Sequence, residues 1–277
     1  MSVIFLEKNH KYQSLDPNEN IDWTSVTSFV GLFKPKFDPV AQSIKSSKNT
    51  KSKWYGLDPI KIQEYWAAEG DRAVTAGTIY HNQREEDITS LNSINRSGVN
   101  IPIVKPIFQD GTKHAPVQKL DEGIYPEHFV YLKSAGVCGQ ADRIEVVKDI
   151  VEVYDYKTNK EIKKTAFKNW EGKTEKMLGP CAHLDNCNFN HYSLQLSIYM
   201  YIILKHNPKL KPGKMFLQHV IFEKEGEDQF GYPILKRDDR GETIVKAVVP
   251  YEVPYLKDEV KNMINWLHDN KVTLKNK

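Results

Sequence analysis

Apolar and polar residues alternate most clearly in the middle of the chain, over two runs at 137–144 and 151–158. The strand-like pattern continues through residues 145–147 and 150, so only residues 148–149 separate the two strands, which is the length of a two-residue hairpin turn. Strand side chains alternate with period two, so the valines of the second run share one face with Asp155 and Lys157. The pattern predicts an antiparallel hairpin in which a buried strand ends in a carboxylate and an ammonium, side by side.

The first strand of this hairpin carries a further carboxylate, Asp142. Pairing of the two strands would bring Asp142 close to Asp155, with Lys157 beside them. Two acids and a lysine at one place indicate a divalent metal site with a cationic base or charge stabiliser. The simpler alternative is a surface ion pair between Asp155 and Lys157, because an Asp-x-Lys sequence alone is a weak signal.

Helical periodicity predicts helices over 58–74, 189–205 and 256–267, and hydroxyl residues around Ser25 suit the start of a short helix before Phe29. Ala76-Gly77-Thr78 interrupts the first of these patterns. We therefore expect a new helix capped by Thr78, with His81 in its first turn and Glu85 one turn later on the same face.

Further strands are expected over 127–132, 215–222 and 243–249, and a short hairpin or arm over 1–24. Two lysine-rich segments, 34–53 and 159–178, are expected to be a solvated loop and a solvated helix face. Each also suits contact with nucleic-acid phosphates, the first as a basic flap over a groove. Residues 90–125 have the composition of loops. The chain is thus expected to be α/β, with a mixed central sheet built on an antiparallel hairpin and flanked by helices.

The 189–205 helix carries polar residues along one edge of its apolar surface. His191, Gln195 and Tyr199 recur there at intervals of four residues. A glutamine in an apolar helix needs a hydrogen-bond partner. This edge is therefore expected to face other polar groups.

Composition narrows the class of protein. The chain has 277 residues, which suits one large domain or two small ones, and a net charge of +3, which permits a polyanionic partner. Three cysteines favour a reducing compartment over a disulfide framework. Val3–Leu6 is too short for a signal peptide and the apolar run 198–204 too short to span a bilayer, so an intracellular protein without membrane contact is expected.

Four short motifs follow one another along the chain: Gly77-Thr78-Ile79-Tyr80-His81, Gly139-Gln140-Ala141-Asp142, Asp155-Tyr156-Lys157-Thr158 and Gln195-Leu196-Ser197-Ile198-Tyr199. Their order and spacing over residues 75–205 resemble the RecB-like branch of the PD-(D/E)XK nuclease superfamily. Relatives in that branch include phage exonucleases, CRISPR-associated adaptation nucleases and the mitochondrial genome maintenance exonuclease.

The resemblance implies a restriction-endonuclease-like fold and a role for each motif residue. His81, Asp142, Asp155 and the carbonyl of Tyr156 would bind Mg²⁺ or Mn²⁺, at one or two metal positions, and Lys157 would assist catalysis. Gln195 and Tyr199 would hold DNA or orient Lys157, while Glu127 and Glu85 would lie beside the ligands. Further DNA contacts would come from hydroxyls and lysines, namely Ser25, Thr27, Thr158, Lys163, Lys164 and Lys168.

The implied activity is metal-dependent hydrolysis of DNA phosphodiester bonds, by an exonuclease of recombination, repair or replication acting on single strands or free ends. Residues 1–277 would form one nuclease domain with 1–57 as an N-terminal extension, and a phage-encoded protein would fit. Several relatives hold an iron–sulfur cluster through four cysteines. This chain has three, so a four-cysteine cluster is not expected.

Two alternatives come from other classes. Cys181, His183, Cys187 and His191 have tolerable spacing for structural zinc, which would make the chain a zinc-stabilised binding module. A nuclease fold without catalysis would give a DNA-binding subunit, although the intact Asp142, Asp155 and Lys157 weigh against that.

Overall fold

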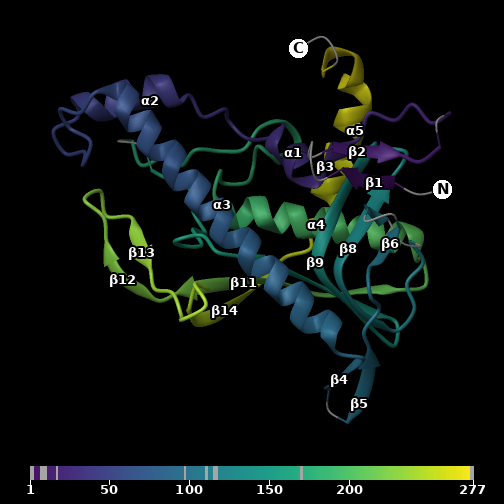
Figure 1. The fold of residues 1–277 in the computed structure, drawn as a ribbon. Helices are drawn as coiled ribbons and strands as arrows, with labels where there is room; N and C mark the ends of the chain where they lie inside the picture. Colours follow the sequence, from purple (N-terminus) through teal and green to yellow (C-terminus); the bar gives the residue numbers. More distant parts are fainter. Residues whose placement is uncertain are drawn as a thin grey trace.

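The structure is a computed structural model that describes residues 3–6, 11–16, 18–96, 98–109, 112–114, 118–168 and 171–274. Within these residues a mixed six-stranded sheet with helices on both faces forms the body of the molecule (Figure 1). The expected α/β architecture with a mixed, helix-flanked sheet is therefore confirmed. Among the described helices, none has both the length and the apolar character that crossing a lipid bilayer requires.

Three consecutive antiparallel strands form the centre of this sheet, as the hydrophobic pattern predicts. They are β8 (Gly123–Leu132), β9 (Val137–Val147) and β10 (Ile150–Lys157). The turn between β9 and β10 contains Lys148 at a φ of 58°, the left-handed conformation that two-residue hairpin turns require. The strand expected over 127–132 starts earlier than predicted, at Gly123.

The remaining strands extend the sheet on both sides of the hairpin. They are β11 (Lys211–Phe222), parallel to β10; β14 (Val245–Val253), antiparallel to β11; and β3 (Thr24–Ser25), parallel to β9. Since β3 pairs with β9, part of the expected N-terminal extension belongs to the main sheet.

Three helices enclose the main core on one face of the sheet. They are α1 (Val26–Gly31), α4 (Asn188–His206) and α5 (Lys257–Leu274). The core combines their apolar faces with Val151 and Val153 of β10. Ser25 caps α1 as predicted, because its side chain accepts a hydrogen bond from the backbone N–H of Ser28 at 3.0 Å.

The opposite face is crossed by α3 (Pro59–Ser90), a single helix of 32 residues. The predicted interruption at 76–78 is therefore wrong, and Thr78 lies inside the helix instead of capping it. Gly77 has a packing role: a Cβ atom there would lie 3.2 Å from Oγ1 of Thr158, so glycine lets α3 approach the end of β10. His81 consequently lies well inside a continuous helix.

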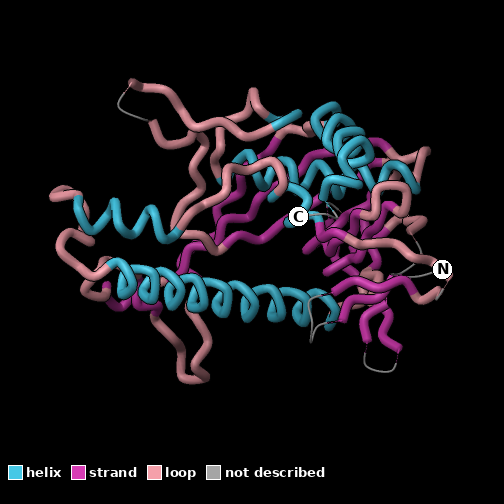
Figure 2. The backbone as a smooth tube through the Cα atoms, turned by 90° about the horizontal axis from the view of Figure 1, so that it is seen from above, coloured by secondary structure: helices cyan, strands magenta, loops and turns pink. Residues whose placement is uncertain are grey.

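The first lysine-rich segment also differs from expectation. It contains α2 (Pro39–Lys48), capped by Asp38 and packed along α3, where a solvated loop was expected. Seen from above, α2 and the first half of α3 extend away from the sheet (Figure 2). Trp54, in the loop between these helices, is buried and stacks on Phe230 with ring centroids 4.8 Å apart.

Small sheets and loops complete the described chain. The N-terminal hairpin of β1 (Val3–Leu6) and β2 (Lys11–Ser14) joins β6 (Ile107–Gln109) and β7 (Thr112–His114) in a second sheet. Two separate hairpins are β4 (Ser93–Arg96) with β5 (Val99–Pro102), and β12 (Lys224–Glu227) with β13 (Pro233–Leu235). Residues 159–168 and 171–178 contain no helix, so the solvated helix face expected there is wrong.

Candidate metal centre

Three carboxylates lie in one row across β8, β9 and β10. Pro126 of β8 pairs with Arg143 of β9, so the next residues along the two strands, Glu127 and Asp142, lie opposite each other. Side chains at opposed positions of an antiparallel pair are close neighbours.

The row continues onto β10. Tyr154 pairs with Arg143, and Asp155 comes next, toward Asp142. The backbone N–H of Tyr156 donates a hydrogen bond of 2.5 Å to Oδ2 of Asp142. The predicted convergence of Asp142 and Asp155 on neighbouring strands is thus present, and Glu127 extends it to a third strand.

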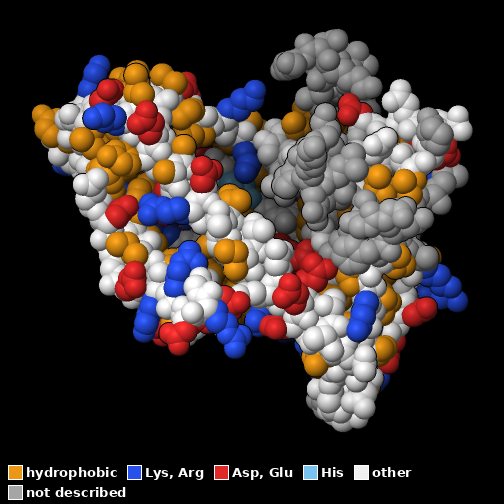
Figure 3. All heavy atoms as spheres, viewed as in Figure 1, with side chains coloured by type: hydrophobic (Ala, Val, Ile, Leu, Met, Phe, Trp, Pro, Cys, Tyr) orange, Lys and Arg blue, Asp and Glu red, His pale blue; other side chains and the backbone are white. Residues whose placement is uncertain are grey.

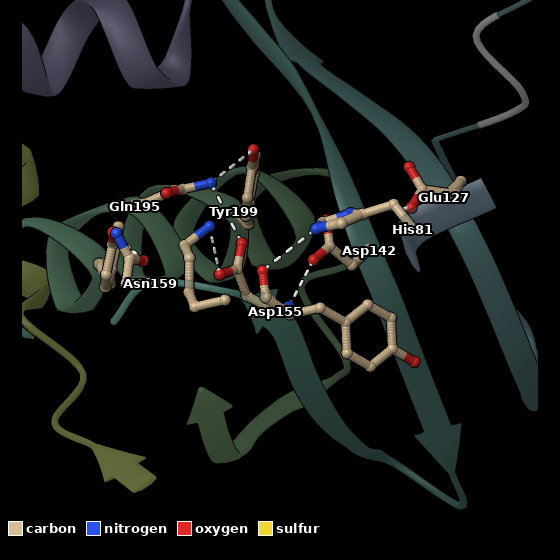
Figure 4. Close-up of polar contacts among 10 residues, drawn as sticks. His81, Glu127, Asp142, Asp155, Asn159, Gln195 and Tyr199 are labelled. Carbon is tan, nitrogen blue, oxygen red and sulfur yellow. Dashed lines mark hydrogen bonds and ion pairs between the residues drawn. The ribbon is translucent and has the colours of Figure 1, made fainter. Parts of the chain in front are cut away.

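His81 of α3 faces one end of this row (Figure 4). Its Nδ1 lies 3.6 Å from Oε1 of Glu127 and 3.5 Å from Oδ1 of Asp142, and its Nε2 lies 3.2 Å from the carbonyl oxygen of Tyr156. His81, Glu127 and Asp142 each present a ligand atom within 4.8 Å of the others. An imidazole and two carboxylates are donors that Mn²⁺ and Mg²⁺ sites use, so these side chains fit a divalent cation.

Asp155 lies at the other end of the row and is held by β10 and α4. Lys157 Nζ lies 2.5 Å from Oδ2 of Asp155, and Gln195 Nε2 donates a hydrogen bond of 3.2 Å to Oδ1. Gln195 also lies 3.4 Å from the hydroxyl of the buried Tyr199. Gln195 therefore has the polar partner that its position in an apolar helix required.

The two ends of the row differ in electrostatics. Burial disfavours a charged His81, but Asp142 and Glu127 outweigh it and raise the pKa of His81 to about 11. Burial also opposes ionisation of Asp142, yet His81 and Lys157 hold its pKa below the ordinary value. Burial and the neighbouring Asp142 raise the pKa of Asp155 to about 6 despite Lys157.

Lys157 is enclosed by groups that favour its charge. Burial alone would lower its pKa, but Asp155 and Asp142 raise it above the ordinary value. The Tyr192 ring, one turn before Gln195 on α4, has its centroid 4.7 Å from Nζ, which is cation–π contact.

Two further residues hold Tyr192 in place. Its hydroxyl donates a hydrogen bond of 2.6 Å to Oδ1 of Asn159, the residue labelled at the left of Figure 4. The backbone carbonyl of Asn159 lies 2.6 Å from Nε2 of the buried His219. None of these three residues was singled out in the sequence. The helical spacing of Tyr192, Gln195 and Tyr199 is the signal that would have found the first of them.

Glu127 was expected beside the ligands, and the structure brings its carboxylate into the group with His81 and Asp142. Its backbone has a φ of 44°, which side chains other than glycine rarely adopt. Such a conformation costs on the order of 1–3 kcal/mol and concentrates at functional sites. Glu85, also expected beside the ligands and one turn after His81 on α3, does not belong to this group of potential ligands.

The remaining predicted DNA contacts lie at varying depth. Thr158 follows Lys157 and meets α3 at Gly77, Ser25 caps α1, and Thr27 is exposed. The predicted lysines are all exposed, with Lys163 paired to Glu161 at 2.9 Å. Lys164 Nζ lies 5.4 Å from the ring centroids of Phe189 and Tyr251, and Lys168 lies next to Phe167, whose side chain is 86% exposed.

The four residues of the zinc alternative do not converge. His183 Nε2 lies 3.1 Å from Oε1 of Glu259, and His191 Nε2 donates to Oδ1 of Asn186 at 2.7 Å. Cys181 and Cys187 are buried free thiols. No three of these four side chains bring ligand atoms together as His81, Glu127 and Asp142 do.

Comparison with known proteins assigns no family to the chain. No protein-family model matches it, and neither does any curated protein. Among solved structures it has a likeness to the crystal structure of SSO0001, with 13% identity, covering 94% of this chain and 80% of that one. The TM-score of 0.32 is too low for this likeness to carry an argument about fold or function.

Proposed function

We propose that the protein is a metal-dependent DNA nuclease with a restriction-endonuclease-like fold, acting as an exonuclease in recombination, repair or replication. One observation carries the proposal: the row of Glu127, Asp142 and Asp155 across three neighbouring strands, with His81 at one end and Lys157 at the other. Carboxylates that converge with a histidine and a lysine suit hydrolysis of a phosphodiester.

His81, Glu127 and Asp142 would hold the divalent cation, with Asp155 as a further oxygen donor at the next position of the row. A bound Mg²⁺ or Mn²⁺ supplies Lewis acidity toward a phosphoryl oxygen. Imidazole in the donor set favours Mn²⁺ over Mg²⁺, since Mg²⁺ prefers oxygen ligands and keeps its waters.

Lys157 would supply positive charge to the scissile phosphate. Its ammonium is buried between Asp155 and the ring of Tyr192, so it is already oriented and needs little reorganisation when negative charge develops. Gln195 and Tyr199 hold Asp155 from α4 and thereby fix the anion that keeps Lys157 in position. Exposed Lys163, Lys164 and Lys168 would contact the DNA backbone.

Asp155→Asn tests the proposal. The variant should lose cleavage of end-labelled DNA in Mn²⁺ or Mg²⁺ to background, because the amide cannot replace the carboxylate charge. Asp149→Asn is the matched control: this aspartate precedes the same strand but is exposed and paired with Lys211. Single-stranded, duplex and circular DNA should be compared, since a circle offers no end to an exonuclease.

Two results would contradict the proposal. Cleavage by Asp155→Asn as fast as by the wild-type protein would remove this site from catalysis. A folded wild-type protein that leaves all three DNA forms intact with both metals would contradict the nuclease function itself. Cleavage of the circle would instead replace the exonuclease by an endonuclease.

A further inference from the structure

Helix α2 buries its polar side and exposes its apolar side. Ser43 and Ser46 face α3 with 0% and 9% of their surfaces exposed, and Ser43 Oγ accepts a hydrogen bond of 3.0 Å from Gln63 Nε2. Val40, one turn before Ser43, and Ile44, next to it, are 54% and 40% exposed. A surface helix normally has the opposite arrangement.

The exposed apolar residues continue beyond the helix. Phe37, just before the N-cap Asp38, is 69% exposed, although its ring centroid lies 5.8 Å from that of Trp66 on α3. We call Phe37, Val40 and Ile44 the α2 stripe. Figure 3 shows hydrophobic side chains gathered among basic and acidic side chains over this end of the molecule. Trp66 covers only part of Phe37, and Val40 and Ile44 are 54% and 40% exposed, so the α2 stripe offers apolar surface to another molecule.

The surroundings of the α2 stripe are basic. Lys36, Lys45 and Lys48 are exposed, and in the described part of the chain they form no ion pair. The neighbouring acid, Asp38, uses its side chain to cap α2 by accepting from the backbone N–H of Ala41 at 3.0 Å. An apolar stripe edged by unpaired lysines is complementary to an apolar surface edged by carboxylates.

We propose that the α2 stripe docks an acidic polypeptide segment of another protein, with apolar side chains at helical spacing against Phe37, Val40 and Ile44. The charge pattern disfavours a second copy of this chain, which would bring lysines against lysines. Single-stranded nucleic acid binds through aromatic rings on which bases stack. Phe37 is the one aromatic residue of the stripe, and its ring already packs against Trp66. Lipid binding scales with buried apolar area, and three side chains offer little.

A dye-labelled peptide of leucines and glutamates, with the leucines at helical spacing, is the probe, and fluorescence anisotropy with the full chain is the measurement. Val40→Ser with Ile44→Ser should weaken binding by at least about tenfold, because two apolar contacts are lost. Val245→Ser with Val248→Ser is the matched control, since these valines are 40% and 42% exposed on β14. The control should bind as the wild-type protein does, and added salt should weaken both.

The proposal would be overturned if the wild-type protein did not bind the peptide, or if the Val40/Ile44 variant bound it equally well. Equal binding of a peptide with the same residues in scrambled order would also overturn it.

A fourth contrary outcome is that the stripe serves another ligand. Binding of a single-stranded oligonucleotide and of vesicles rich in anionic lipid tests this. Loss of either interaction in the Val40/Ile44 variant alone would reassign the stripe. Thermal melting of both double variants establishes that they are folded.

Discussion

The carboxylates at the two ends of the row have different surroundings. At one end, His81 faces Glu127 and Asp142 at 3.5–3.6 Å, distances longer than close ion pairs. At the other, Lys157 contacts Asp155 at 2.5 Å, and Gln195 occupies the second oxygen. At the first end, potential metal-ligand atoms surround a common point. At the second, Lys157 and Gln195 each bind an oxygen of Asp155.

This difference separates two tasks that neighbouring carboxylates can perform. Ligand atoms around a common point suit cation binding. A carboxylate already bound by lysine and glutamine suits positioning of that lysine, besides the oxygen it would offer to the cation. On the proposed function, substitutions at the His81 end should change metal affinity. Substitutions at the Lys157 end should change the catalytic rate.

The largest effect is expected at the Lys157 end. Lys157→Ala should lower kcat at least about a hundredfold, because a transition-state charge stabiliser is lost, with little change in Mn²⁺ affinity. Lys157→Arg should restore little, since guanidinium has a different shape and reach. Lys214→Ala, whose ammonium pairs with Glu252 on the surface, is the control. Full activity of Lys157→Ala would reduce Asp155 and Lys157 to a structural ion pair.

The His81 end should give the complementary result. His81→Ala should weaken Mn²⁺ binding, measured by calorimetry, at least about tenfold, and activity should fall with it. Glu85→Ala, one turn along α3 and outside the group of potential ligands, should do much less. If Glu85→Ala lost metal binding while His81→Ala kept it, the two ends of the row would have to be reassigned.

A smaller effect tests how Lys157 is held. Tyr192→Leu should lower kcat by about three- to tenfold with KM little changed, since it removes a cation–π contact of 4.7 Å. Tyr192→Phe keeps the ring and loses only the hydroxyl bonded to Asn159, so it should retain most of the rate. Equal losses in the two variants would transfer the role from the ring to the hydroxyl.

The smallest effect concerns a histidine in the opposite environment to His81. Burial and the nearby Lys34 lower the pKa of His191 to about 4, compared with about 6.5 in an unfolded chain. Between these values the unfolded chain binds a proton that the folded protein does not, so the free energy of unfolding decreases as pH falls from about 6.5 to about 4. Above that range His191 contributes no pH dependence.

His191→Gln should remove this contribution, because glutamine does not titrate and its amide can still donate to Asn186. Urea unfolding at pH 7 and at pH 4.5 measures it: the variant should lose less stability between the two than the wild-type protein. His183→Gln is the control, since His183 is exposed. Equal losses in wild type and His191→Gln would place the titration elsewhere.

The central hairpin was predictable because alternation and a two-residue turn fix strand register locally. Register then brings Asp142 and Asp155 together. On α4, the recurrence of His191, Gln195 and Tyr199 at intervals of four residues indicates that Gln195 faces polar groups. The place of Glu127 was less accessible. The left-handed backbone of Glu127 depends on the strands around it, and the local sequence Pro-Glu-His does not predict this conformation.

The helices α2 and α3 show where local signals mislead. Gly77 indicates a break on propensity, yet tertiary packing against Thr158 uses the missing side chain and the helix continues. In α2, serines and lysines favour a solvated loop, because helix prediction expects apolar residues to face inward. The buried residues of α2 are serines. The apolar residues of this helix are exposed, so they do not mark the side that packs on α3.

Helix α3 fixes the angular position of His81. Each residue of an α-helix turns the chain by about 100°, so a register shift of one residue would swing the imidazole away from Glu127 and Asp142. One turn earlier, the absence of a side chain at Gly77 lets α3 lie close to the end of β10, because a Cβ atom there would come within 3.2 Å of Thr158 Oγ1. A bulkier residue at 77 would press on Thr158 and so strain the placement of His81, although it contacts none of the carboxylates.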